Sequence, residues 1–284
     1  MNAVEMHAHS HYSDGSDSPR EVVRKAKEAG LMGICLTDHD STHGLVEFLD
    51  ALEEFQMEGL PGIELSSVFQ GTVVHILGYG ININMPYVLD TLFNKNWQAL
   101  NSRIIQSLEL YRKAGIMDIS VEEMNKVVGA KGPAALKLWL RDYRVRFCNV
   151  SYNQAKAESK PGGLAFADYD RNLLLTAREA IHAIHILGGV PIWAHPGKLV
   201  TRDKFKFLEL LKMFMKNGLY GMEVDHPENG PTTETLRLLA NENDLFISAG
   251  SDYHGRFKPN ISLGLKSITY SHFLKMQYDL QKIN

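Results

Sequence analysis

Short hydrophobic runs alternate with amphipathic stretches at the start of the chain. Residues 3–6 and 33–37 have the composition of strands, and residues 18–30 between them place apolar side chains at helical spacing. The Ser-Pro-Arg-Glu sequence at 18–21 combines an N-cap, a first-turn proline and a capping-box glutamate. The pattern therefore predicts a strand, a helix and a second strand.

The same alternation predicts the elements that follow. A helix capped by Ser41 is expected to run to about residue 57. A third strand is expected to end at Glu64, and a fourth to cover residues 72–79. In the last third of the chain we expect helices at 176–187, 203–217, 232–242 and 271–282, and strands at 190–194, 221–224 and 245–249.

The middle of the chain breaks this alternation. Helical patterns cover 84–114, 121–128 and 133–147, and a polar stretch covers 151–163. We interpret residues 96–165 as a helical insert, with residues 1–95 and 166–284 as the two parts of one α/β domain. About seven strand–helix units predict a parallel sheet in a closed or nearly closed β/α barrel.

Composition narrows the class of protein. A chain of 284 residues with 44% hydrophobic side chains can bury a full core. Cys35 and Cys148 are too few for a disulfide framework, which favours a reducing cytoplasm. No apolar stretch approaches the roughly 18 residues of a membrane span, and candidate ligands from residue 7 leave no room for a cleaved signal. We expect a cytoplasmic protein with no obligate protein partner.

Charge is unevenly distributed along the chain. The net charge is −3, but residues 95–160 hold 12 Lys and Arg against 6 Asp and Glu, a net +6 that leaves −9 elsewhere. An acidic body that collects cations, beside a basic segment that attracts anions, suits a phosphorylated substrate. The count also fits lysines and arginines exposed on helix surfaces.

The first strand runs directly into His7-Ala8-His9. Residues i and i+2 of a strand point to the same face, so two imidazoles can reach one ion. The pair also fits two surface histidines on an edge strand. Further ligand-type residues lie at or just after the ends of predicted strands: Asp38, His39, Glu64, His195, Glu223, Asp252 and His254. A β/α barrel gathers its chemistry at that end of the strands.

Seven segments together resemble the motifs of the polymerase and histidinol phosphatase (PHP) family, in the family's order. They are His7-Ala8-His9, Ser13-Asp14-Gly15, Thr37-Asp38-His39-Asp40, Gly62-Ile63-Glu64, His75, Ala194-His195-Pro196-Gly197 and Gly250-Ser251-Asp252-Tyr253-His254. The resemblance spans nearly the whole chain outside the insert. It is strongest to stand-alone phosphoesterases acting on small nucleotides, which also carry a Ser-Asp-Gly and an insert with an arginine at the place of Arg103. It implies a distorted (β/α)7, TIM-like barrel with a helical insertion.

The resemblance also implies three divalent ions, of Mn, Fe or Zn. It assigns His7, His9, Glu64 and Asp252 to the first ion, Glu64, His75 and His195 to the second, and Asp14, His39 and His254 to the third. Mixed imidazole and carboxylate ligation suits these metals, and a bridging carboxylate offsets the repulsion between neighbouring cations.

Catalytic support is expected from acidic residues near the histidines. Metal-bound histidines need an acceptor for the free ring N–H, and Glu5, Asp38 and Asp40 are the candidates. Glu5 departs from the family's usual aspartate. His11 replaces a small hydroxyl residue, so it either competes with Asp14 for the third ion or lies in solvent.

Substrate contacts are expected from the insert. Related inserts often carry Arg-Pro-His where this chain has Lys131-Gly132-Pro133, so Lys131 is expected to replace that arginine in part. Arg103 and Lys131 are the candidates for binding a second phosphate or the nucleotide. His226 stands where an aromatic residue is usual, and it either protonates a leaving group or is a histidine of a surface loop.

The resemblance implies metal-dependent hydrolysis of a phosphate ester. The expected substrate is a nucleoside mono- or 3′,5′-bisphosphate, or the 5′ end of a short oligonucleotide. One alternative is a phosphatase for histidinol phosphate or a sugar phosphate. A second alternative, from another class, is a non-catalytic module that binds metal or nucleotide.

Overall fold

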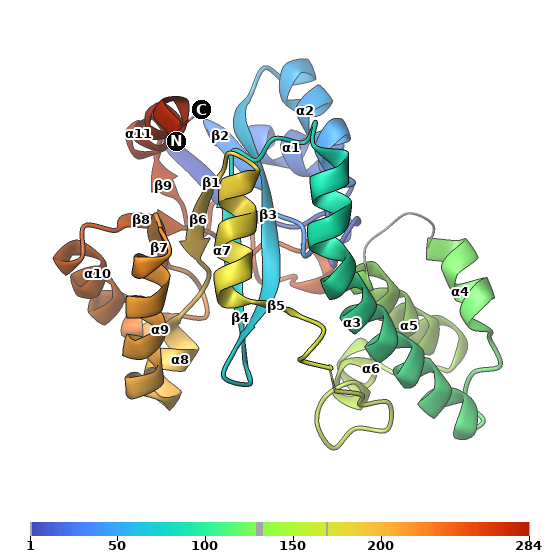
Figure 1. Cartoon of the computed structure of the whole chain (residues 1–284). Coiled ribbons are helices and arrows are strands. Elements are labelled where there is room, and N and C mark those ends of the chain that lie inside the picture. The colour runs from blue at the N-terminus through green and yellow to red at the C-terminus, as the bar shows by residue number, and fades with distance from the viewer. Residues whose placement is uncertain (1, 129–132, 169, 284) are drawn as a thin grey trace.

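The computed structural model describes residues 2–128, 133–168 and 170–283. Its centre is one mixed sheet, curved into a nearly closed barrel and surrounded by helices (Figure 1). The strands are β1 (Ala3–Ala8), β2 (Gly33–Leu36), β3 (Glu58–Phe69), β4 (Thr72–Tyr79), β5 (Leu175–Thr176), β6 (Val190–Trp193), β7 (Gly221–Asp225), β8 (Phe246–Ala249) and β9 (Ile268–Thr269). They follow the order β8-β7-β6-β4-β3-β2-β1-β9, with β5 beside β3.

The barrel closes where the segment after β8 returns to β1. The backbone N–H of His9 donates to the carbonyl of Tyr253 at 2.9 Å, and the N–H of Tyr253 donates to the carbonyl of His7 at 3.2 Å. The predicted β/α barrel is thus confirmed, and its two ends in sequence meet at the first candidate ligands.

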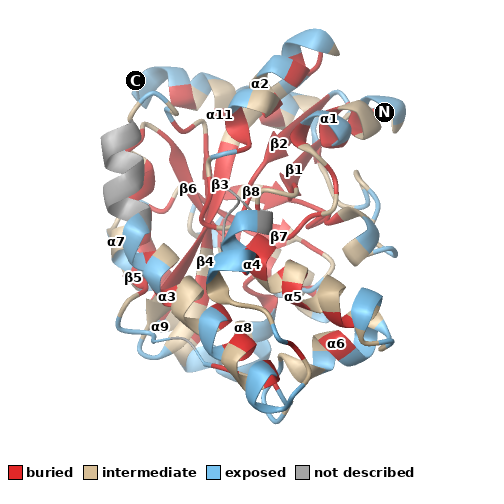
Figure 2. Ribbon diagram, turned by 90° about the vertical axis from the view of Figure 1, so that its right-hand side faces the viewer, coloured by how far each residue is buried: buried red, intermediate tan, exposed pale blue. Residues whose placement is uncertain are grey.

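Helices cover the outside of this sheet. They are α1 (Pro19–Glu28), α2 (Leu45–Glu54), α7 (Ala177–Ile186), α8 (Gly197–Arg202), α9 (Lys204–Lys216), α10 (Thr233–Glu242) and α11 (Tyr270–Ile283). Most strand residues are buried, as Figure 2 shows, because helices pack on the sheet from outside while side chains fill the inside. The capping box predicted for α1 is present, with Ser18 and Glu21 each accepting the other's backbone N–H.

The expected all-parallel sheet is wrong at β4. Strand β3 continues past Glu64 and turns back, so β4 pairs antiparallel with β3 and with β6. Gln70 and Gly71 form this turn with φ of 45° and 72°. Two left-handed residues in a two-residue loop match the twist of a hairpin. A hairpin, rather than a helix, therefore connects the third and fourth strands.

The cap predicted at Ser41 is also wrong. Helix α2 begins at Leu45 with Gly44 at the N-cap, and Ser41 Oγ instead lies 3.2 Å from His43 Nδ1. Asp40, with φ of 48°, turns the chain before the helix begins. The polar stretch after residue 150 contains a helix that we did not predict, α6 (Tyr152–Glu158), capped by Ser151.

The middle of the chain forms a helical unit of α3 (Pro86–Lys113), α4 (Val121–Val128), α5 (Pro133–Phe147) and α6, which projects to one side in Figure 1. It has its own apolar cluster, including Leu108, Met124 and Leu140. Asn96 ties α3 to the barrel, since its Nδ2 donates to Asp40 Oδ1 and to the Ser66 carbonyl, both at 2.6 Å. The insert boundaries at 96 and 165 stay a prediction.

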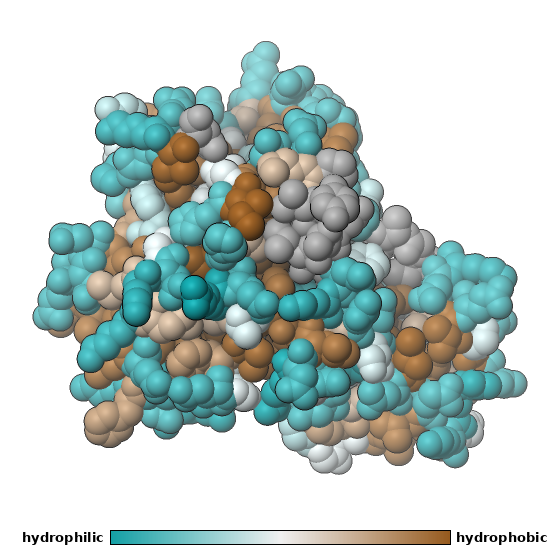
Figure 3. All heavy atoms as spheres, viewed as in Figure 1, coloured by the Kyte–Doolittle hydropathy of each residue, from teal (hydrophilic) through white to brown (hydrophobic). Residues whose placement is uncertain are grey.

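The face seen in Figure 3 is mostly hydrophilic, with hydrophobic residues in small groups between charged ones. Within the described residues, every helix is too short or too polar to cross a membrane.

Candidate metal centre

Strand β1 brings two imidazoles together inside the barrel. His7 and His9 are fully buried, and their Nε2 atoms lie 3.0 Å apart. Asp252 Oδ1, after β8, lies 3.3 Å from His9 Nε2 and 3.8 Å from His7 Nε2. His7 and His9 thus face the same way, as the strand spacing predicts, and Asp252 from the segment after β8 joins them.

Glu64 lies at the centre of the cluster with its two oxygens facing different histidines. Its Oε2 is 3.1 Å from His7 Nε2 and 3.3 Å from His9 Nε2. Its Oε1 is 3.0 Å from His75 Nδ1 and 2.9 Å from His195 Nε2. A carboxylate placed in this way can bridge two cations.

A further group surrounds Asp14, in the loop after β1. Asp14 Oδ1 lies 3.0 Å from His254 Nε2 and 3.8 Å from His39 Nε2. His254 Nδ1 lies 2.8 Å from the carbonyl of Asp252. A ring N–H donated to that carbonyl leaves the lone pair of Nε2 directed at the cluster.

The donor set fits divalent ions. Four groups of residues can each hold an ion, because within each group the ligand atoms lie within 4.8 Å of one another. They are His9, Asp14, His39 and His254; His7, His9 and Asp252; His39, Glu64 and His75; and His7, Glu223 and His226. Asp14 Oδ1 and His39 Nδ1 are buried with no hydrogen-bond partner in the described part of the chain. Buried polar atoms normally have partners, and a bound cation would serve both atoms.

The carboxylates of the cluster are held in their ionised form. Burial alone would raise the pKa of Glu64, but the charges of His39, His7 and His75 hold that pKa well below its ordinary value. The pKa of Asp252 is lowered in the same way, against burial, chiefly by His254. These carboxylates are therefore available as ligands.

Glu223, on β7, orients two of the histidines. Its Oε1 lies 2.8 Å from His7 Nδ1, and its Oε2 accepts the backbone N–H of His195 at 2.7 Å. A carboxylate on Nδ1 fixes the ring tautomer, so that His7 Nε2 is free for a metal. The sequence places Glu223 at a strand end, but it does not reveal which carboxylate reaches which ring.

The predicted ring acceptors contact the backbone and hydroxyls instead. Asp38 accepts hydrogen bonds from Ser10 Oγ at 2.6 Å and Ser13 Oγ at 2.5 Å, and it reaches His9 through Ser13, whose Oγ is 3.4 Å from His9 Nδ1. It therefore braces the loop after β1 and acts on a histidine indirectly.

Glu5 and Asp40 also serve the backbone. Glu5 accepts the N–H groups of His7, Ser251 and Gly264 at 2.9 to 3.0 Å, which joins three segments around the site. Asp40 accepts from Ser66 Oγ and Asn96 Nδ2, both at 2.6 Å. These contacts place Asp40 between the hairpin and α3.

His226 is not the surface-loop histidine of one expectation. It is 1% exposed, and its Nδ1 accepts the N–H of Glu228 at 3.0 Å. Its Nε2, 3.6 Å from Asp252 Oδ2, has no hydrogen-bond partner among the described residues. Because the ring lies against His7 and His195, the contacts suit a buried part of the cluster better than a proton donor.

The geometry favours Asp14 over His11 as the ligand that joins His39 and His254. His11 packs its ring against Tyr12, with ring centroids 4.8 Å apart. Among the described residues, the candidate groups include Asp14 and do not include His11.

Several ligand segments have an unusual backbone. His195 and Asp252 have φ of 30° and 58°, in a region that non-glycine residues rarely occupy and that is frequent at functional sites. Gly250 lies so close to β1 that a Cβ there would be 2.2 Å from His7 Cβ. The glycine is therefore required for the approach of β8 to the first ligand.

A cavity of about 270 Å³ opens beside the cluster and is bordered by the helical unit. Its cationic lining is Lys137, Arg141, Lys156 and Lys258. Lys137, on α5, lies 3.3 Å from Asp14 Oδ2. Neither Lys137 nor Arg141 was predicted, although their spacing of four places them on one face of a predicted helix.

Of the two residues predicted to contact substrate, Arg103 lies beside the metal centre. Arg103 lines a small adjoining cavity with His39, His75 and Lys137, and its Nε donates to the Ala167 carbonyl at 2.8 Å. Lys131 lies outside the described residues.

Glu223→Gln should weaken metal binding by roughly 10- to 100-fold, the usual effect of losing a carboxylate that supports a ligating histidine. Gln keeps the shape but removes the charge that holds His7 Nδ1 protonated. Titration of metal-free protein with Mn measures the change. The exposed Glu242→Gln is the control, and an unaltered titration for Glu223→Gln would show that this contact does not support the site.

Comparison with known proteins agrees with this geometry. The PHP domain model matches residues 5–226. Phosphoribosyl 1,2-cyclic phosphate 1,2-diphosphodiesterase of Eggerthella lenta is 29% identical, over 89% of this chain and 94% of that protein. The 5′-3′ exoribonuclease Rnm of Escherichia coli is 30% identical, over 92% of this chain and 88% of that protein.

A solved structure from Bifidobacterium adolescentis, provisionally assigned as a metal-dependent phosphoesterase, superimposes with a TM-score of 0.83 at 25% identity. The alignment covers 97% of this chain and 95% of that one. The family model spans most of the chain, and the clustered histidines and carboxylates supply the ligands that such enzymes need. The chain therefore belongs to the PHP family and is a metal-dependent phosphoesterase.

Proposed function

We propose that this enzyme hydrolyses a phosphate ester of a small nucleotide that carries a second phosphate, either a nucleoside 3′,5′-bisphosphate or the 5′ end of a short oligonucleotide. The observation that carries the proposal is the position of Lys137 and Arg141, which line the cavity that opens onto Asp14, Glu64 and Asp252. The E. coli and E. lenta relatives act on RNA and on a phosphoribosyl cyclic phosphate, as their names state.

We further propose that the nine predicted ligands hold three divalent ions of Mn, Fe or Zn. The support is their grouping: Glu64 has one oxygen toward His7 and His9 and the other toward His75 and His195, while Asp14 lies with His39 and His254. When bound, such ions supply positive charge to phosphate oxygens and lower the pKa of water.

The chain's own residues have separate tasks in this reaction. Glu223 and the Ser13–Asp38 pair hold the rings of His7 and His9 with their Nε2 atoms toward the centre. Lys137 and Arg141 bind the phosphate that is not hydrolysed. Tyr152 and Phe257, stacked with centroids 5.7 Å apart, border the same cavity and can support the nucleoside.

The test is a panel of phosphate-release assays with Mn at low salt. A nucleoside 3′,5′-bisphosphate should exceed a monophosphate in kcat/KM by about tenfold, since one more charge-assisted contact contributes about 1.4 kcal/mol. Lys137→Ala and Arg141→Ala should each reduce this ratio, and added salt should do the same.

Lys113→Ala is the matched control, because Lys113 is an exposed lysine on α3 of the same helical unit. Equal values for bisphosphate and monophosphate, unchanged by both cavity substitutions, would contradict a second-phosphate site. Preference for histidinol phosphate or a sugar phosphate over every nucleotide would favour the alternative phosphatase.

A further inference from the structure

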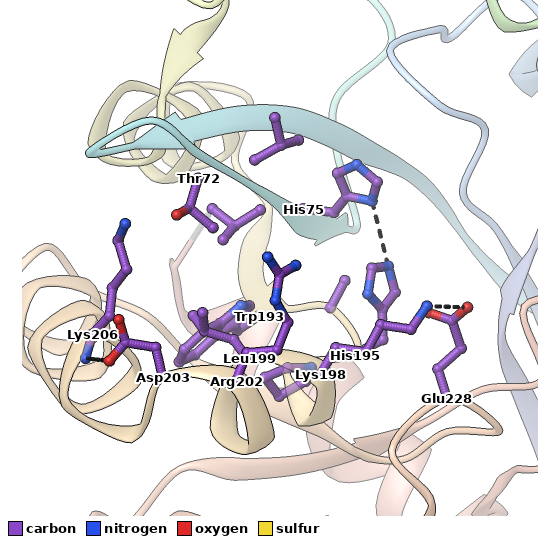
Figure 4. Close-up of a pocket in the computed structure, with 14 residues that line it drawn as sticks. Thr72, His75, Trp193, His195, Lys198, Leu199, Arg202, Asp203, Lys206 and Glu228 are labelled. Atoms are coloured by element: carbon purple, nitrogen blue, oxygen red, sulfur yellow. Dashed lines mark hydrogen bonds and ion pairs between the residues drawn. The ribbon is translucent and has the colours of Figure 1, made fainter. Parts of the chain in front are cut away.

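A larger cavity, of about 510 Å³, opens beside His75 and His195 of the metal centre (Figure 4). His75 and His195 line both this cavity and the smaller cavity of about 270 Å³ that Lys137 and Arg141 line. From these histidines it extends along α8 and the start of α9 to Thr72, at the turn of the β3–β4 hairpin. A ligand at the metal centre can therefore continue into it.

The cavity combines an apolar wall with three cations. Trp193 and Leu199 form part of the wall, and Lys198, Arg202 and Lys206 supply the charges. The smaller cavity is near the lower limit of about 300 Å³ for small-molecule pockets. It has room for little more than one nucleotide, whereas this one can hold a longer portion of a strand.

Two of the cations are already engaged. Lys198 Nζ lies 2.6 Å from Glu228 Oε1, and Lys206 Nζ donates to the Gln70 carbonyl at 3.1 Å. The acidic Asp203 accepts the backbone N–H of Lys206 at 3.0 Å, as the cap of α9.

Arg202 differs from both lysines. In the part of the chain that the structure describes, its side chain has no hydrogen bond or ion pair. Figure 4 shows its guanidinium extended from α8 into the cavity, toward the strand that carries His75. A guanidinium offers paired N–H donors that match two phosphate oxygens, and it is less strongly hydrated than an ammonium.

We propose that this cavity binds the continuing strand of an oligonucleotide whose 5′-terminal phosphoester lies at the metal centre, and that Arg202 binds a phosphate of that strand. This inference rests on the proposed function and extends it, because it assigns the terminal nucleotide to the smaller cavity and the rest of the strand to the larger one. Arg202 then determines preference for length, whereas Lys137 and Arg141 serve every nucleotide.

The experiment compares wild type with Arg202→Ala on a nucleoside 3′,5′-bisphosphate and a 5′-phosphorylated ribo-pentanucleotide, with Mn. Arg202→Ala should lower kcat/KM for the pentanucleotide about tenfold, mostly through KM, while the bisphosphate changes less than twofold. The loss of one phosphate contact should also make the salt dependence of pentanucleotide binding shallower, by about 0.7 in log–log slope. Arg178→Ala, which removes an exposed arginine of α7 outside the cavity, should change neither substrate.

Binding of a fluorescent phosphorothioate pentanucleotide, followed by anisotropy, gives a readout independent of turnover. Weaker binding by Arg202→Ala but not by Arg178→Ala supports the inference. Equal loss on both substrates, or no loss on either substrate and unchanged anisotropy, overturns it while the proposed function stands. Failure of wild type to hydrolyse any nucleotide would instead contradict the proposed function.

Discussion

Glu64→Gln should reduce phosphate release by about 10²- to 10³-fold or more, with the fold preserved. The glutamate is 1% exposed and is the residue whose two oxygens face different pairs of histidines. Gln has nearly the same volume, so packing is retained, but the negative charge that could join two cations is lost. Loss of a preorganised charge contact in an enclosed site typically has an effect of this size.

Metal content gives the second readout for this substitution. Elemental analysis after gel filtration should find about three ions per wild-type chain and a loss of two in Glu64→Gln, because Asp14, His39 and His254 form a group without Glu64. Glu242→Gln, an exposed change on α10, should have full activity and metal content. Activity of Glu64→Gln within threefold of wild type would contradict a bridging role, and one ion or fewer in wild type would contradict the three-ion proposal.

The candidate ligands could be located from sequence because most of them lie in a strand or shortly after one. His7 and His9 have the spacing of one strand face, Glu64 lies within β3, and His195 and Asp252 follow β6 and β8. These strands meet inside the barrel. This inference requires the order of strands and helices but no knowledge of side-chain conformation. Hydrophobic periodicity supplies that order for long elements.

The supporting contacts could not be predicted because they depend on rotamers and on segments far apart in sequence. Glu223 reaches His7 across 216 positions, whereas the nearer Asp38 turns to Ser10 and Ser13. The hairpin at Gln70 and the helix α8, of six residues, are too short to have a period of their own. Helix α8 carries Arg202, so the cavity beside the metal centre could not be expected from sequence either.

Removal of the ions should lower the midpoint of thermal unfolding by roughly 5–10 °C per strongly bound site. A ligand at a hundred times its Kd stabilises the folded state by about 2.7 kcal/mol, and about 2–4 °C corresponds to each kcal/mol in chains of this size class. Without a cation, Asp14 Oδ1 and His39 Nδ1 stay buried with no hydrogen-bond partner among the described residues. Chelation followed by dialysis, then scanning calorimetry with and without added Mn, measures the difference.

The stability lost on chelation should grow as pH rises. In the metal-free chain, burial by itself would lower the pKa of His9, but hydrogen bonds to Asp252 and Glu64 raise it to about 9. The pKa of His9 in the folded chain thus exceeds its value of about 6.5 in the unfolded chain. Protonated His9 therefore contributes its full stabilisation below pH 6.5, and this stabilisation is lost as pH rises through 9. Metal ions require neutral imidazole, so metal binding strengthens over the same range. Calorimetry at pH 6.5 and pH 9 should therefore find the larger difference in unfolding midpoint between metal-loaded and metal-free protein at pH 9. A difference that stays constant or shrinks from pH 6.5 to pH 9 would show that His9 does not ligate a metal.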